Sequence, residues 1–95
     1  MKTVLVVEDD KDVRRLIHRV IGDSYSVLQA EDRSQARQVI KKTPVDLVLL
    51  DLHLPPAPDT PQEGMKTLEE IRSTDLETKV IVITADREQE TALQA

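Results

Sequence analysis

Polar side chains that could do chemistry stand directly after three of the apolar runs of this sequence. They are Glu8, Asp9 and Asp10 after the first run, Asp51 after a later one, and Thr84 after the last. Crowded carboxylates repel one another unless a cation is present, and oxygen ligands of this kind suit Mg²⁺. An aspartate at a metal can act as a nucleophile toward a phosphoryl group, and a nearby hydroxyl can donate a hydrogen bond to the transferred group.

Hydrophobic periodicity predicts the elements that carry these side chains. Short β-branched runs are typical of buried strands, and apolar residues spaced three and four apart are typical of helices. The predicted strands are residues 3–7, 25–29, 45–50 and 80–83, the second being a weak edge strand. The predicted helices cover residues 13–21, 36–40, 65–71 and 86–95. Four prolines between positions 55 and 61 predict a loop.

Strict alternation of strands and helices predicts an α/β fold with a doubly wound parallel sheet and helices on both faces. Ligands of such sheets bind beyond the carboxyl ends of the strands. If the strands at 3–7 and 45–50 are neighbours, Glu8, Asp9 and Asp51 converge on one spot.

Composition limits the classes of function. The 95 residues allow one domain, and a net charge of -5 argues against binding of nucleic acid by this segment. The absence of cysteine excludes disulfides and thiolate chemistry and fits a cytoplasmic protein. No apolar run is long enough to span a membrane, and the N-terminus lacks the order of a signal peptide.

Each candidate also has an ordinary structural interpretation. Asp10, and less so Asp9, could cap the following helix; Asp51 could form a turn; and Thr84 could be a helix N-cap. The conjunction of the three strand ends favours a metal and phosphoryl site. The side chains expected at the surface are His18, His53 and the arginines Arg14, Arg15 and Arg19, which are interpreted as a solvated helix face.

The segments around Glu8-Asp9-Asp10, around Asp51-Leu-His-Leu-Pro55 and around Val-Ile-Val-Ile-Thr84-Ala85 together resemble the receiver domain of two-component response regulators. The resemblance covers the whole chain and implies a flavodoxin-like sheet of strand order 2-1-3-4-5. It also implies cytoplasmic signalling with a sensor histidine kinase as partner.

The resemblance further implies a role for each matching residue. Asp51 would accept the phosphoryl group, and Thr84 would supply the switch hydroxyl. Glu8, Asp9, Asp51 and the backbone carbonyl of His53 would hold Mg²⁺. Asp10 matches no ligand position and keeps its interpretation as a cap.

The sequence departs from the family in two places. The family's fifth strand, with its phosphoryl-contacting lysine, and the last helix are absent. Residues 1–95 are therefore expected to be a receiver domain incomplete at the C-terminus, whose partner is an output domain in a longer chain or a second receiver. Lys79 begins the fourth strand, at the wrong end to replace that lysine. Gly64 follows Asp51 only after the proline-rich loop, which is similar to that of receivers tied to exopolysaccharide and exosortase-type systems, often with sigma-54 activator outputs.

Three functional hypotheses follow. The first is a phosphorylation-dependent switch, with no enzymatic activity beyond self-phosphorylation from a donor and slow autodephosphorylation. The second is a degenerate receiver that acts as a phosphorylation-independent dimerisation or binding module, such as a homodimer pairing through the strand at 80–83. The third, a small Mg²⁺-dependent phosphatase, is disfavoured because residue 8 is Glu where such enzymes use Asp and the chain is too short for a cap domain.

Overall fold

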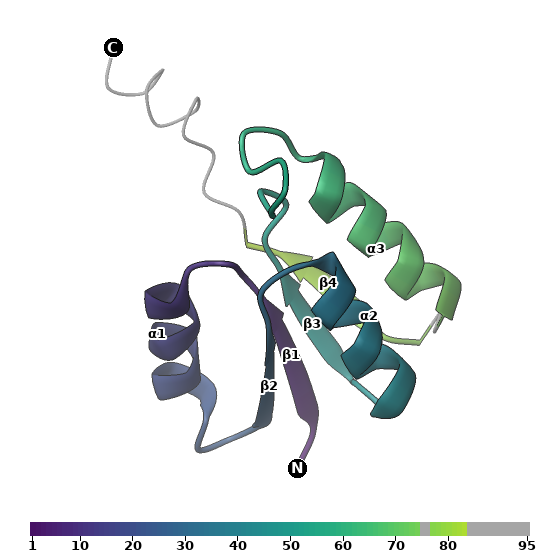
Figure 1. The fold of residues 1–95 in the computed structure, drawn as a ribbon. Helices are drawn as coiled ribbons and strands as arrows, with labels where there is room; N and C mark the ends of the chain where they lie inside the picture. The colour runs from purple at the N-terminus through teal and green to yellow at the C-terminus, as the bar shows by residue number, and fades with distance from the viewer. Residues whose placement is uncertain (75–76, 84–95) are drawn as a thin grey trace.

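Strands and helices alternate along the chain in the computed structural model, which describes residues 1–74 and 77–83 (Figure 1). The elements are β1 (Thr3–Val7), α1 (Lys11–Ile21), β2 (Ser26–Ala30), α2 (Arg33–Lys42), β3 (Leu47–Leu50), α3 (Gln62–Thr74) and β4 (Lys79–Val82). The predicted alternation is confirmed up to β4, and the helix predicted at 86–95 lies outside the described residues. Within those residues, no helix combines the length and hydropathy that a bilayer crossing needs.

The four strands form one parallel sheet in the order β2-β1-β3-β4. This order agrees with the predicted flavodoxin-like order over the strands that are described. The central strand β1 is buried from Val4 to Val7, because layers of side chains cover both of its faces. That burial explains why its sequence is a continuous apolar run rather than an alternating one.

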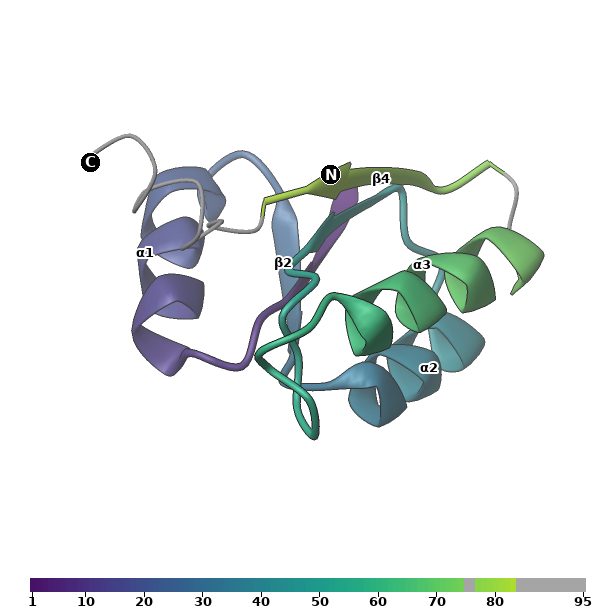
Figure 2. The ribbon, with the colours of Figure 1, turned by 90° about the horizontal axis from the view of Figure 1, so that it is seen from above.

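Helices cover both faces of the sheet. Helices α2 and α3 lie side by side on one face, and α1 lies on the other (Figures 1 and 2). The chain therefore leaves β1 toward one face and leaves β3 toward the opposite face. Because β1 and β3 are neighbours, the carboxyl ends of these two strands form the switch point where ligands of such folds bind.

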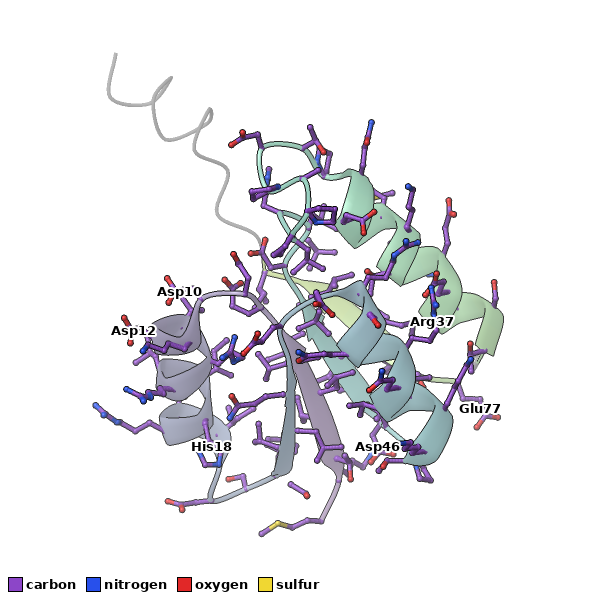
Figure 3. All side chains as sticks on the ribbon, in the orientation of Figure 1. Asp10, Asp12, His18, Arg37, Asp46 and Glu77 are labelled. Atoms are coloured by element: carbon purple, nitrogen blue, oxygen red, sulfur yellow. The ribbon has the colours of Figure 1, made fainter. Side chains whose placement is uncertain are left out.

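The main core lies between the sheet and the α2–α3 pair and contains aliphatic side chains. Its buried members include Leu5, Val48, Leu50, Leu54 and Ile71. Ion pairs join the two helices above this core. Arg37 of α2, labelled in Figure 3, lies 2.8 Å from the Glu70 carboxylate of α3, and Arg33 reaches Glu63 and Glu70 at 3.3 Å.

The apolar stripe expected along α1 is only partly buried. Val13, Ile17 and Ile21 are half-buried, whereas Leu16 is 58% exposed and Val20 is 72% exposed. Among the described residues, α1 has no second helix beside it on its face of the sheet (Figure 2), which agrees with the exposure of Leu16 and Val20.

Candidate functional site

The ends of β1 and β3 bring the predicted carboxylates together. The backbone N–H of Asp51 donates to the carbonyl of Val7 at 2.9 Å, and that of Glu8 donates to the carbonyl of Ala30 at 2.9 Å. These bonds extend the sheet ladder one residue beyond each strand. As a result, one carboxylate oxygen each from Glu8, Asp9 and Asp51 lies within 4.8 Å of the others.

Two of these carboxylates are buried. Glu8 is 7% exposed and Asp51 is 8% exposed, whereas Asp9 is open to solvent. Burial raises the pKa of Glu8 from 4.5 to about 8, with further contributions from the hydrogen bond and the charge of Asp51. Without a cation, the Glu8 carboxyl therefore keeps a proton at neutral pH. A divalent cation would relieve the same crowding by displacing that proton.

Asp10 caps α1, as its capping interpretation predicted. Its Oδ1 accepts a hydrogen bond from the backbone N–H of Asp12 at 2.8 Å (both residues are labelled at the start of α1 in Figure 3). Its own backbone N–H donates to Oε1 of Glu8 at 3.2 Å. Asp10 therefore acts on the carboxylate cluster through its backbone, and its side chain serves the helix.

His53 contacts the site through its backbone and the loop through its ring. Its N–H donates to Oδ1 of Asp51 at 2.9 Å, which fixes that carboxylate. Its Nδ1 lies 2.9 Å from the carbonyl oxygen of Pro58. The imidazole is thus engaged with the proline-rich loop, and it is not part of the carboxylate cluster found among the described residues. His18 is exposed on α1.

Arg14 corrects the interpretation of the three arginines as a solvated helix face. Arg15 and Arg19 are exposed, but Arg14 is 8% exposed. It donates to the backbone carbonyl of Glu8 at 2.6 Å and to that of Asp9 at 3.1 Å. The sequence places Arg14 three and seven residues before Ile17 and Ile21, on their side of the helix, but this spacing alone does not distinguish a buried arginine from a solvated one.

The fourth strand reaches the site from the other side of β3. The backbone N–H of Ile83 donates to the carbonyl of Leu50 at 2.9 Å, directly before Asp51. Thr84 itself lies outside the described residues, so its predicted role is a proposal. Lys79 pairs with Leu47 at the opposite end of β4, which agrees with its exclusion as a phosphoryl contact.

Gly64 returns the chain to the site after the proline-rich loop. Its N–H donates to the carbonyl of Leu52 at 3.1 Å, and a Cβ at this position would collide with the Cα of Leu52. The excursion from Pro55 to Pro61, which follows the buried Leu54, therefore returns the chain to a point beside Leu52. The contact between Gly64 and Leu52 fixes the start of α3 close to the end of β3.

Known proteins are similar to this chain in sequence and fold. CcdB of Bacillus subtilis is 34% identical over 97 residues, covering 100% of this chain and 77% of that protein. The probable C4-dicarboxylate response regulator DctR of B. subtilis is 35% identical over 91 residues, covering 93% of this chain and 38% of that protein. The structure of the response regulator TrrA of Thermotoga maritima, in complex with Mg²⁺ and BeF, superposes with a TM-score of 0.79 at 29% identity, covering 98% of this chain and 77% of that chain.

The match to the family covers nearly all of the sequence. The model of the response regulator receiver domain matches residues 4–95. The matched segment contains all of the described strand residues except Thr3, together with the switch point and the carboxylates. The chain spans well under half the length of DctR. This chain therefore belongs to the family of response regulator receiver domains.

Proposed function

We propose that Asp51 accepts a phosphoryl group from the phosphohistidine of a sensor histidine kinase, and that Glu8 and Asp9 support the transfer by holding Mg²⁺. The observation that carries this proposal is the convergence of the three carboxylates within 4.8 Å at the switch point between β1 and β3. Buried carboxylates are costly without a counter-ion, so a fold that gathers them is expected to compensate with a cation.

The residues present fit Mg²⁺. The cluster offers only oxygen ligands, and its exposed member Asp9 leaves room for the water molecules that Mg²⁺ retains. Glu8, Asp9, Asp51 and the backbone carbonyl of His53 would hold the ion. When bound, Mg²⁺ supplies charge neutralisation to the incoming phosphoryl oxygens. The similar TrrA structure is a complex with Mg²⁺ and BeF, which supports the same metal for this chain.

In the transfer, a carboxylate oxygen of Asp51 attacks phosphorus. A P–O bond to Asp51 forms, the P–N bond of the phosphohistidine breaks, and the electron pair of that bond stays on the departing imidazole. The backbone N–H of His53, 2.9 Å from Oδ1 of Asp51, holds the carboxylate in a fixed orientation during the attack.

The remaining roles concern the switch and its partners. The hydroxyl of Thr84 would donate a hydrogen bond to the phosphoryl group, since β4 approaches Asp51 along Leu50. Phosphorylation of Asp51 would shift the conformation around Thr84 and so alter contacts with an output domain or a second receiver. The chain would act in the cytoplasm as a signalling phosphoacceptor, with slow loss of the phosphoryl group as its own chemistry. The exosortase and sigma-54 subgroup suggested by the proline-rich loop stays a prediction.

The test is the intact mass of the chain after incubation with acetyl phosphate, with and without Mg²⁺. We expect the gain of one phosphoryl group that requires Mg²⁺ and is lost in Asp51→Asn. Asp59→Asn, an exposed aspartate of the neighbouring loop, is the matched control and should still gain the group. The complete product of the gene should be tested beside this chain, because the family's lysine would come from a further strand.

The outcomes separate the hypotheses. A gain that persists in Asp51→Asn would assign the phosphoryl group to another residue. A gain confined to the longer product would show that elements beyond residue 95 are required. No gain in either product would favour the degenerate, dimerising receiver. The exposed Ile81 and Val82 of β4 would then be the first surface to test for pairing.

A further inference from the structure

Arg14 joins three segments around the start of the carboxylate cluster. Its Nη1 donates to the carbonyl oxygens of Glu8 and Asp9, at 2.6 and 3.1 Å. Its Nε donates to Oε1 of Gln29 at 3.1 Å, and its Nη2 lies 3.4 Å from Oε1 of Glu31. The guanidinium is therefore held by β2 and the loop after it on one edge, and binds the β1–α1 connection with the other.

The two carbonyls that Arg14 holds belong to consecutive residues, and both residues present carboxylates to the cluster. Holding two successive carbonyls orients the peptide plane between them, and with it the directions in which the Cα–Cβ bonds of Glu8 and Asp9 leave the backbone. A planar guanidinium with several N–H donors can do this while remaining anchored elsewhere. An ammonium group, which is a compact point charge on a flexible stem, cannot hold all these acceptors in the same geometry.

We propose that Arg14 is a positioning residue, which holds the Glu8–Asp9 backbone in the conformation that presents both carboxylates to a divalent cation. The inference rests on the proposed function, because it concerns the same metal site. It assigns to Arg14 no contact with the metal or with the phosphoryl group. Its effect passes entirely through the backbone of the two acidic residues.

The positive charge of Arg14 and its positioning role would change Mg²⁺ affinity in opposite directions when Arg14 is replaced. A cation beside an acidic site repels Mg²⁺, so removing its charge alone would tighten Mg²⁺ binding. Loss of positioning would weaken Mg²⁺ binding, since partners that orient ligands usually contribute about 10- to 100-fold to metal affinity. The two effects have opposite signs. If Arg14 were merely a structural clamp on α1, the folded molecules of a charge-removing variant would show only the tighter Mg²⁺ binding.

The experiment is a Mg²⁺ titration followed by ¹H–¹⁵N NMR at fixed pH and ionic strength. It compares the unsubstituted chain with Arg14→Met, Arg14→Lys and the matched control Arg15→Met, which removes a charge from an exposed position of the same helix. We expect both Arg14 variants to bind Mg²⁺ at least about tenfold more weakly. Arg15→Met should bind Mg²⁺ as the unsubstituted chain does, or slightly more tightly.

Each outcome decides the proposal. Unchanged or tighter Mg²⁺ binding in a folded Arg14 variant would overturn it. If Arg14→Met does not fold, Arg14→Lys decides, because it keeps the charge and removes the fork of donors. If neither variant folds, Arg14 is a structural clamp and the positioning role is rejected. Failure of the unsubstituted chain to bind Mg²⁺ would instead overturn the proposed function, and this inference with it.

Discussion

Glu8 is the residue whose protonation is most strongly coupled to the fold. Its carboxyl is buried next to Asp51, and its pKa is raised to about 8 from an ordinary value of 4.5. Between these two pH values the folded chain holds a proton that the unfolded chain has released. The free energy of unfolding contributed by Glu8 is therefore fully present below pH 4.5 and is lost as the pH rises through 8.

Glu8→Gln should remove this pH dependence, because the amide has the same shape and does not titrate. As the pH rises from about 5.5 to about 8.5, we expect the stability of the variant to increase by at least about 1 kcal/mol relative to that of the unsubstituted chain. This figure is a lower bound, because a shift of one pKa unit alone corresponds to about 1.4 kcal/mol. Urea unfolding in a chelator at several pH values measures the difference. Parallel stability curves for the two chains would show that Glu8 titrates normally in the folded state.

Residue-scale features divide into those that the sequence predicts and those that it does not. The carboxylates at the strand ends are predictable, because parallel strands end at the same edge of the sheet. The capping role of Asp10 follows from its place before a helix. The burial of Arg14 is not predicted, because a charged side chain on a helix is usually solvated. Its acceptors are backbone carbonyls and groups on β2 that the local pattern does not reveal.

At the scale of elements, Gly64 decides how α3 meets the end of β3. Alanine normally stabilises a helix interior by about 1 kcal/mol relative to glycine. Here a Cβ would collide with the backbone of Leu52, and backbone cannot move aside as a flexible side chain can. We therefore expect Gly64→Ala to destabilise the fold by about 1–3 kcal/mol, the opposite sign to helix propensity.

Thermal or urea unfolding measures this change. Glu69→Ala, at an exposed position of the same helix, is the matched control and should change stability by about 0.5 kcal/mol or less. A stabilised Gly64→Ala variant would mean that α3 can draw back from Leu52. The loop between Leu52 and α3 would then be flexible enough to absorb the added methyl group.

The elements themselves are largely predictable from periodicity, with an instructive exception. The four strands follow from apolar runs and alternation, whereas their order is implied by the resemblance to the receiver family. The stripe on α1 is present in the sequence, yet Leu16 and Val20 lie exposed. Periodicity locates the apolar residues of a helix, but which of them become buried depends on what packs beside the helix. The contact between Gly64 and Leu52 is also a tertiary contact. It could not be predicted from the sequence, because the proline-rich loop separates the two residues along the chain.

At the scale of the whole molecule, Mg²⁺ binding and proton release should be linked. Binding requires the ionised form of Glu8, so Mg²⁺ affinity should rise with pH up to about 8 and level off above it. The increase can reach about tenfold per pH unit while one proton is displaced. Mg²⁺ titrations by NMR at several pH values on either side of this pKa measure the slope. A slope of zero would mean that Glu8 takes no part in holding the metal.

Phosphorylation of the whole molecule is proposed to occur on Asp51 alone. The most direct measurement is borohydride trapping after phosphotransfer from a phosphorylated histidine kinase or acetyl phosphate in the presence of Mg²⁺, followed by peptide mass spectrometry. Reduction converts an aspartyl phosphate to homoserine, so we predict homoserine at position 51 and at no other aspartate, and none when Mg²⁺ is withheld. Homoserine at another position, or an unmodified Asp51 in a chain that has gained phosphate, would contradict this assignment.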